Sequence, residues 1–324
     1  MPMYSQHRIG VVIPAYNEEN LIEDTLKSIP RYVDRIYVID DGSTDATAEK
    51  IRGFETDLRY VNIRHESNSG VGAAITTGYR RALKDGIDII AVMAGDNQMD
   101  PKYLPYLLDP IVWHIADYTK GNRLLNHVAK NGMPPFRSFG NSLLTYVTKM
   151  SSGYYEMIDP QNGYTAISRR ALQRIDLDSV YQGYGYCNDL LAKLNVAGCK
   201  VLDVVIPAKY GKEKSKIRYS IYIFKVSWLL FKTFMWRLYM KYFVIEFHPI
   251  IIFYIFGFLL SLLGAAGGVY SFYHKVFEQG LFFVNGMLSL ILFMIGLQFV
   301  LFGIIFDIQK RDRMTAHEIL SRLK

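Results

Sequence analysis

The stretch RIGVVIPAYNEE, Arg8 to Glu19, decides the fold, because a run of apolar, mostly β-branched residues ends there in a polar loop. Similar apolar runs return in RIYVIDDGSTD from Arg35, RYVNIRHE from Arg59 and IDIIAVMAGDNQ from Ile87. Helical patterns separate them, so we expect strand–helix units with nearly continuous apolar strands. Such strands are typical of an α/β, Rossmann-like fold, a mostly parallel sheet with helices on both faces.

The helical segments carry their own boundary signals. EENLIEDTLKSIP is predicted to be a helix closed by Pro30, and STDATAEKIRGF a helix capped by Ser43 or Thr44. The third, GVGAAITTGYRRALKDG, resembles a dinucleotide fingerprint only in part, because the sixth position is Ile75 and the segment follows the third strand. An NAD enzyme is therefore a weak alternative. We expect Gly70 and Gly72 to let a helix N-terminus approach the sheet or a phosphate.

Two long apolar runs follow the α/β part. Residues 247–274 and 279–306 each span 28 residues without Asp, Glu, Lys or Arg. A bilayer core needs about 20 apolar residues in a helix, whereas buried core helices average about 11 residues. We therefore predict a transmembrane hairpin, with spans at about 247–272 and 281–306, in preference to core helices.

The charge distribution predicts the orientation of this hairpin. The net charge is +7, and basic residues gather beside the predicted spans, at 209–241 and 310–313, while the connection holds only Lys275. The positive-inside rule then puts both termini and the α/β domain in the cytosol. Anionic headgroups and phosphate substrates explain this placement better than nucleic acid does. Cys187 and Cys199 lack disulfide or metal-site patterns, which fits a reduced cytosolic domain.

These observations divide the chain into four parts. We expect a cytosolic catalytic domain over 1–212, a basic loop and amphipathic interfacial helix over 213–243, the hairpin over 244–308, and a cytosolic basic tail over 309–324. The N-terminus enters the first strand without a long apolar region, so no cleaved signal peptide is expected. Small residues in the spans are predicted to pack either the hairpin or an oligomer: Gly264, Gly268, Ser289, Gly296 and Gly303.

Polar clusters follow three of the predicted strands. PAYNEE, DDGSTD and GDNQ all fall at carboxyl ends of strands, where open α/β sheets bind ligands. Carboxylates and loop amides there suit a nucleoside. Each of these motifs alone also occurs in ordinary turns and helix caps. The prediction therefore rests on the order of the three motifs along the chain.

In that order, VVIPAYNEE, VIDDGSTD, NSGVGAAITTGYRRA, MAGDNQ and DPQNGYTAISRRAL resemble glycosyltransferase family 2, with its GT-A fold. The chain is most similar within it to the polyprenyl-phosphate glycosyltransferases, such as dolichyl-phosphate mannose synthase and the bactoprenol glucosyltransferases. The likeness covers about residues 8–218. It implies a nucleotide-binding set made of Pro14, Ala15, Tyr16, Glu18, Asp41, Ser43, Gly95 and Asp96.

The resemblance also implies a metal site for Mg²⁺ or Mn²⁺ formed by Asp96 and Gln98. The first acid of the family's Asp-x-Asp motif is Ala94 here. Mg²⁺ keeps several waters and takes other ligands from substrate phosphates, so one carboxylate and one amide are enough for a weakened but working site. The alternative is that Asp96 only caps the helix after DNQMDP.

Further residues receive roles from the same resemblance. Arg123, Arg137 and Asn141 would bind the acceptor phosphate, although a solvated basic loop is the alternative. Asp159 would face the reacting centre, and Asp189 is the candidate base for transfer to a sugar hydroxyl, or a sugar-binding or structural acid. A loop with Lys214, Ser215 and Lys216 would close over the diphosphate, or the basic run would bind anionic lipid.

The resulting prediction is an inverting, metal-dependent hexosyltransferase in the membrane, the plasma membrane if the chain is prokaryotic. It would take a nucleotide sugar of the UDP-glucose or GDP-mannose type and a polyprenyl phosphate, with no nucleic-acid partner and a possible homo-oligomer. A polysaccharide or glycolipid synthase is the second hypothesis, although no tryptophan lies in the Gln-x-x-Arg-Trp motif of such enzymes. A catalytically inactive nucleotide-sugar-binding protein, suggested by Ala94, is the third.

Overall fold

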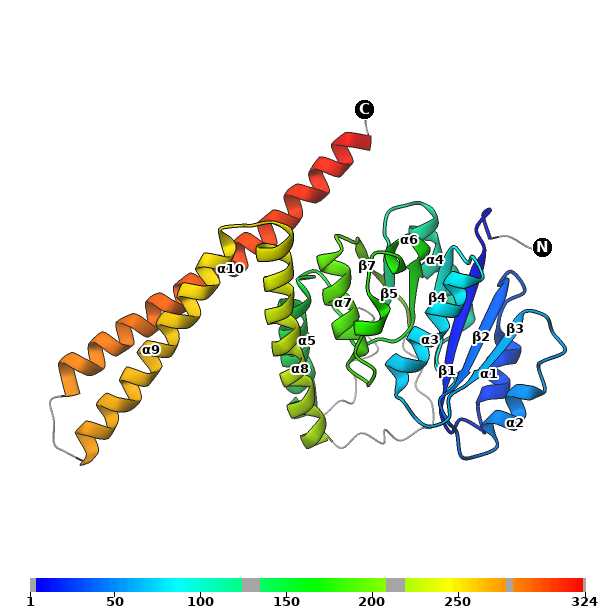
Figure 1. The fold of residues 1–324 in the computed structure, drawn as a ribbon, viewed down its shortest axis with the longest axis horizontal. Coiled ribbons are helices and arrows are strands. Elements are labelled where there is room, and N and C mark those ends of the chain that lie inside the picture. Colours follow the sequence, from blue (N-terminus) through cyan, green and yellow to red (C-terminus); the bar gives the residue numbers. More distant parts are fainter. Residues whose placement is uncertain (1–3, 124–134, 208–218, 278–281, 323–324) are drawn as a thin grey trace. The chain divides into compact units, whose positions relative to one another are not determined.

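The computed structural model describes residues 4–123, 135–207, 219–277 and 282–322 (Figure 1). Within these ranges, the side chains of 135–143, 219–224, 282–283 and 310–322 are not described. The chain divides into two compact units, Met1–Arg237 and Leu238–Lys324. The first unit contains the sheet and the second contains the apolar helices.

The first unit is built on one seven-stranded sheet in the order β3-β2-β1-β4-β6-β5-β7. Neighbouring strands are parallel except at β6, which runs antiparallel to β4 and β5. The predicted mostly parallel sheet is therefore confirmed. The strands are β1 (Ile9–Ala15), β2 (Arg35–Asp40), β3 (Tyr60–Arg64), β4 (Ile89–Val92), β5 (Tyr118–Asn122), β6 (Thr165–Ser168) and β7 (Val201–Val205).

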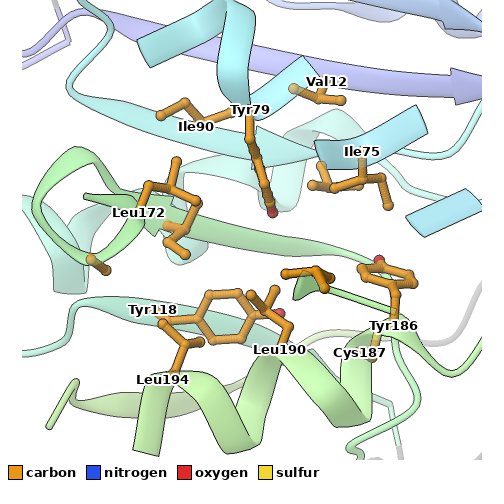
Figure 2. Packing of buried hydrophobic residues seen from close by; sticks show 14 of the residues in the cluster. Val12, Ile75, Tyr79, Ile90, Tyr118, Leu172, Tyr186, Cys187, Leu190 and Leu194 are labelled. Atoms are coloured by element: carbon orange, nitrogen blue, oxygen red, sulfur yellow. The ribbon is translucent and has the colours of Figure 1, made fainter. Parts of the chain in front are cut away.

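Helices cover both faces of the sheet, as predicted. Alternation along β1 shows the two cores, because Val12 packs with α3 and α7 while Val11 and Ile13 pack with α1 and α4. Figure 2 shows the first core, where Tyr79 of α3 and Tyr118 of β5 approach Leu190 of α7. The helices are α1 (Ile22–Ser28), α2 (Thr47–Arg52), α3 (Val71–Lys84), α4 (Leu104–Val112), α5 (Pro135–Ser152), α6 (Arg169–Leu172) and α7 (Tyr186–Val196).

The predicted cap of α2 is wrong. The helix begins at Thr47 and its N-cap is Ala46, which makes no side-chain cap. Ser43 instead accepts a hydrogen bond from the amide of Asn17 at 3.0 Å, and the Thr44 amide donates to the Asn17 side chain at 2.9 Å. These polar residues therefore join the loops after β1 and β2 and do not start the helix.

The glycines before α3 allow two backbone segments to touch. A Cβ on Gly70 would lie 2.5 Å from the carbonyl oxygen of Gln182, and one on Gly72 would lie 2.3 Å from that of Tyr181. Gly70 also has φ +98°, a conformation that side chains disfavour. The amide of Gly72 donates to Gln182 at 2.7 Å. The expected close approach at this helix end is thus made to the segment around 181–183.

The helix α8 (Tyr219–Tyr239) is joined to α5 through Arg237. This arginine is fully buried, and its guanidinium donates to the carbonyls of Met150 and Ser151, each at 3.0 Å. These carbonyls lie in the last turn of α5, where helices lack internal partners. A Cβ on Gly153 (φ +75°) would lie 2.6 Å from the guanidinium. Arg237, counted above among the basic residues near the membrane, therefore has a structural task.

The second unit consists of a π-helical segment (Met240–Ile245) and two long helices, α9 (Ile250–Phe277) and α10 (Phe282–Arg322). The segments Ile250–Phe277 and Val284–Gln309 are long and apolar enough to cross a membrane, with mean hydropathies of 2.3 and 2.6. Only 22% and 17% of their most apolar windows are buried, unlike core helices. Both helices fit a membrane-anchored protein.

Small residues bring the two helices of the hairpin into contact. A Cβ on Gly264 would lie 2.4 Å from the amide nitrogen of Phe293, and one on Gly296 would lie 2.4 Å from that of Ser261. Gly268 has nothing within 4 Å of its Cβ position. Gly264 and Gly296 thus pack the hairpin itself. At its open end, the hydroxyl of Tyr242 donates to the buried Asp307.

Candidate active site

A pocket of about 420 Å³ lies at the edge of the sheet where β4, β5 and β7 end. Because β6 is reversed, the segment that precedes it reaches the same edge as the segments that follow its neighbours. Four stretches of chain therefore meet there. The lining residues are Asp96, Gln98, Met99, Asp100, Lys102, Tyr103, Arg123, Asn162, Gly163, Tyr164, Ile206 and Pro207.

Asp96 and Gln98, the predicted metal ligands, both line this pocket. They belong to a tight turn in which the Gln98 amide donates to Asp96 Oδ1 at 3.1 Å and Asn97 has φ +54°. The 3₁₀ helix at Pro101–Tyr103 is capped by Asp100, which accepts from the Lys102 amide at 3.0 Å. The alternative that Asp96 caps this helix is therefore wrong.

Gly95 brings this turn close to the loop after β1. Its amide donates to the carbonyl of Pro14 at 3.3 Å, and a Cβ there would lie 3.2 Å from Ile22. The Gly95 carbonyl accepts from the Thr25 hydroxyl at 3.0 Å. A side chain at this position would push the β1 and β4 loops apart, so the glycine sets their spacing.

The donor set fits a hard divalent cation with few protein ligands. Asp96 offers carboxylate oxygens and Gln98 an amide oxygen, which are the ligand types that Mg²⁺ and Mn²⁺ prefer. The described residues contain no group of three or more His, Cys, Asp or Glu side chains placed to hold an ion. A metal bound here would therefore depend on water and on phosphate oxygens for the rest of its coordination.

Arg123 and Asp159, which were assigned separate roles, are joined in an ion pair. The Arg123 Nε donates to Asp159 Oδ2 at 2.9 Å, and Nη2 donates to Oδ1 at 3.3 Å. The Arg123 side chain is 42% exposed and lines the pocket, whereas that of Asp159 is 3% exposed. The buried carboxylate thus orients the guanidinium toward the pocket by a two-point contact.

Sequence reasoning missed a polar layer beneath this pair. Lys120 and Asn122 lie on β5 and are fully buried, and Asp203 lies on the adjacent strand β7. Lys120 Nζ donates to the backbone carbonyl of Asn162. The side-chain Nδ2 of Asn162 in turn donates to the carbonyl of Gly121 at 2.7 Å. The available signal was KGN, a lysine and an asparagine in a segment that the sheet buries.

Hydrogen bonds join the predicted nucleotide-binding loop after β1 to the loop that follows β2 and to the start of α2. The amide of Glu18 donates to Thr47 Oγ1 at 2.8 Å and that of Glu19 to Asp45 Oδ2 at 3.2 Å, while Tyr16 remains 42% exposed. The Pro14 and Ala15 positions end the buried strand β1. Of the predicted nucleotide-binding set, Asp96 lines the pocket described above, and Gly95 and the residues before it do not. Their nucleoside contacts stay a prediction.

Asp41 has a clear structural role. Its buried carboxylate accepts from the amides of Ser69 at 3.0 Å and Gly70 at 2.8 Å. His65 Nδ1 lies 2.7 Å from the same carboxylate, and its Nε2 lies 3.1 Å from Thr77 Oγ1. Asp41 therefore holds the loop before α3 against the end of β2.

The remaining predicted residues lie elsewhere. Asp189 is buried on α7, where it accepts from Lys193 at 2.7 Å and from the Tyr181 amide at 2.8 Å, and it does not line the pocket. The backbone of Arg137 and Asn141 belongs to α5, but their side chains lie outside the described part of the chain. Lys214, Ser215 and Lys216 lie outside the described residues altogether.

The first unit is thus a mostly parallel, GT-A-like α/β sheet in which an acidic turn after β4 and the Arg123 guanidinium line one pocket. The chain belongs to glycosyl transferase family 2, whose family model matches residues 10–176.

Two relatives of the chain act on polyprenyl phosphates according to their names. The chain is 31% identical over 203 residues to a UDP-N-acetylglucosamine–dolichyl-phosphate N-acetylglucosaminyltransferase from Methanococcus voltae, covering 58% of this chain and 80% of the relative. It is 27% identical over 203 residues to an undecaprenyl-phosphate mannosyltransferase from Micrococcus luteus, covering 61% and 82%. These relatives are polyprenyl-phosphate glycosyltransferases.

A solved structure supports the fold. Glucosyl-3-phosphoglycerate synthase from Mycobacterium tuberculosis, in complex with Mn²⁺, UDP and phosphoglyceric acid, superposes with a TM-score of 0.52 at 21% identity. The match covers 71% of this chain and 78% of that one. At this identity the likeness shows the shared GT-A-like architecture alone.

Proposed function

We propose that this protein transfers a hexose from a nucleotide sugar to a polyprenyl phosphate at the cytosolic face of a membrane, with inversion at the anomeric carbon. The observation that carries the proposal is the pocket lined by Asp96, Gln98 and Arg123, with the buried Asp159 paired to Arg123. One side offers oxygen ligands for a metal-bound diphosphate, and the other offers a guanidinium for a second phosphate. The donor would be of the UDP-glucose or GDP-mannose type.

In the proposed reaction, an oxygen of the lipid phosphate forms a bond to the anomeric carbon while the bond from that carbon to the nucleoside diphosphate breaks. The lipid phosphate is already anionic near neutral pH, so the step needs no general base. Rate enhancement then comes from positioning two charged reactants and from electrostatics. The residues proposed to do this are fixed by backbone turns and an ion pair, which favours such preorganisation.

Within this proposal, Asp96 and Gln98 would hold Mg²⁺ or Mn²⁺, which when bound would neutralise charge on the departing nucleoside diphosphate. Pro14, Ala15, Tyr16, Glu18, Asp41, Ser43 and Gly95 remain the proposed nucleotide set. Arg123 would bind the acceptor phosphate with Arg137 and Asn141. The basic loop with Lys214, Ser215 and Lys216 would cover the diphosphate.

The outer face of α8 supports a position at the membrane surface. One side of this helix is buried in the first unit, at Val226, Leu230 and Arg237. The opposite side exposes Trp228 and Phe231, whose rings stack at 5.9 Å, with lysines at 225 and 232 also exposed. Aromatic rings and lysines are the residues that settle at a lipid interface. We propose that α8 is the interfacial helix and that both termini are cytosolic.

The test is release of nucleoside diphosphate by the purified full-length protein from a panel of UDP- and GDP-sugars. Each sugar is assayed with and without polyprenyl phosphate, in Mg²⁺, Mn²⁺ or EDTA. Release that requires both the lipid phosphate and the metal would support the proposal and identify the donor.

Two other outcomes would favour the alternatives. Release without lipid would indicate a sugar acceptor, as in a polysaccharide or glycolipid synthase, or hydrolysis. That reading would need a base, and the candidate Asp189 is engaged in a buried ion pair with Lys193. Binding of nucleotide without release would indicate that Ala94 marks an inactive protein.

A further inference from the structure

One oxygen of Asp203 joins both sides of the Arg123–Asp159 pair. Asp203 Oδ2 accepts a hydrogen bond from the backbone amide of Ile158 at 2.7 Å and another from Asn122 Nδ2 at 3.0 Å. Ile158 directly precedes Asp159, and Asn122 directly precedes Arg123. A single carboxylate on β7 therefore fixes the chain on either side of the proposed phosphate-binding pair.

We propose that Asp203 is a positioning residue, which holds Arg123 and Asp159 in the geometry that receives the acceptor phosphate. This inference rests on the proposed function. Asp203 does not line the pocket, so it would act only through the two residues that it bonds.

The surroundings of Asp203 show that its carboxylate is costly to bury. Its Oδ1 is buried without a hydrogen-bond partner among the described residues. Burial raises the pKa of this carboxyl above its ordinary value, while the Ile158 amide, the Lys120 charge and the Asp159 amide lower it and the Asp159 charge adds the smallest contribution, an increase. An apolar side chain would avoid the cost. An apolar side chain, however, has no oxygen to accept from Ile158 and Asn122 at once.

Loss of the Asp203 contacts would change the position of Arg123 in the pocket. The backbone amide of Arg123 also donates to Asp159 Oδ2 at 3.3 Å. The end of β5 and residues 158–159 are therefore fixed relative to each other. Without Asp203 Oδ2, the Ile158 amide and the buried Asn122 side chain both lose an acceptor. The Ile158 amide or the Asn122 side chain would then turn toward another acceptor. Such a turn would shift Asp159, and with it the Arg123 guanidinium. Misplacement by about 1 Å is enough to cost two orders of magnitude in rate.

The experiment measures kcat and the KM values of both substrates for the full-length wild type and for Asp203→Ala, Asp203→Asn and Asp203→Ser. The alanine variant removes both contacts, and the serine hydroxyl is too short to accept from both donors. The asparagine variant keeps one oxygen able to accept from both. We expect the KM for polyprenyl phosphate to rise, or kcat to fall, on the order of tenfold or more in the alanine and serine variants. The KM for nucleotide sugar should stay the same, and asparagine should restore most of the activity.

A matched control lies at the opposite end of the same strands. Asp117 Oδ2 accepts from the Lys200 amide at 2.9 Å, just before β5 and β7 begin. Asp117→Ala should therefore lower the melting temperature in a similar way without raising the KM for polyprenyl phosphate or lowering kcat.

The outcomes separate the inference from the proposed function. A wild type without lipid-dependent release would overturn the proposed function before any variant is compared. An active wild type whose serine or alanine variant matches Asp117→Ala in both kinetic constants would overturn the role of Asp203. If the alanine variant does not fold, the serine and asparagine variants decide, because equal values of both kcat and the KM for polyprenyl phosphate in these two would also overturn it.

Discussion

Arg123 and Asp159 meet through a two-point ion pair in which the acid is buried and the base faces the pocket, with Arg123 Nε 2.9 Å from Asp159 Oδ2. The pair lies 36 residues apart in sequence, at the end of β5 and ahead of the reversed strand β6. Asp159 thus acts on the pocket through Arg123. This geometry makes orientation of the guanidinium, beyond its charge, the property to test.

Arg123→Lys should separate these two properties. Lysine keeps the positive charge but cannot form the planar fork that holds Asp159. We expect the KM for polyprenyl phosphate to rise about tenfold, since one charge-assisted hydrogen bond is worth about 1.5 kcal/mol. The KM for the nucleotide sugar should change little. Steady-state rates at varied lipid concentration measure both values, and an unchanged KM for the lipid would place the acceptor phosphate elsewhere.

Asp96→Ala should abolish turnover while the protein remains folded. Asp96 contributes a carboxylate to the pocket and, in the described contacts, accepts the Gln98 amide within its own turn. The control is Asp34→Ala, which removes an acceptor for the Ile9 amide at the opposite edge of the sheet. Thermal unfolding and nucleoside diphosphate release are measured for both variants. Wild-type turnover in the Asp96 variant would remove this residue from the mechanism.

Arg237→Met should destabilise the first unit by about 3 kcal/mol, because it deprives two carbonyls at the end of α5 of charged donors. Lys232→Met on the exposed side of α8 is the matched control and should be nearly neutral. Chemical denaturation in detergent compares the two. Equal stability of both variants would show that water or other groups serve these carbonyls equally well.

The pH dependence of stability should carry a signature of Asp203. Its pKa is raised in the folded protein chiefly by burial, against the opposing effects of the Ile158 amide, the Lys120 charge and the Asp159 amide. The folded state therefore keeps a proton at pH values where the unfolded chain has released it, so stability falls as pH rises from the ordinary aspartate pKa through the raised value. Asp203→Asn should flatten this slope. Melting curves from pH 4 to 7 would test it, and an unchanged slope would count against the burial effect.

Gly264→Leu and Gly296→Leu should disrupt the hairpin, whereas Gly268→Leu should not. A Cβ at either of the first two positions meets the backbone of the partner helix, but the third position is open. Because close helix contact in lipid depends on small residues, the first two variants should lose hairpin packing. Cysteine cross-linking between α9 and α10 reports on that packing. Equal cross-linking in all three variants would argue against the predicted difference.

Sequence reasoning found the features that follow from local pattern. The strands β1 to β4, the helices that follow them and the apolar hairpin all have periodicities that physical rules link to structure. The cap of α2 was missed because Ser43 and Thr44 found partners in the loop containing Asn17, a contact over more than 25 residues. Local helix-capping propensity does not predict hydrogen-bond partners that are this far apart in the sequence.

The missed parts of the candidate site have the same cause. Lys120, Asn122 and Asp203 acquire their roles only when β5 pairs with β7, which brings together residues 81 or more positions apart, as the Asn122–Asp203 contact shows. The reversed direction of β6 decides that Asn162 and its neighbours reach the pocket edge. Pairing partners and strand direction are tertiary properties, which the alternation of apolar residues in one segment does not encode.

The contact of Arg237 with α5 has a consequence for biosynthesis. The last carbonyls of α5 are served by a side chain that the ribosome adds 86 residues later. Completion of the first unit therefore waits until nearly all of α8 has been made, just before the first apolar helix at Ile250 begins. The last contact of the first unit and the synthesis of the two apolar helices are therefore close together in time.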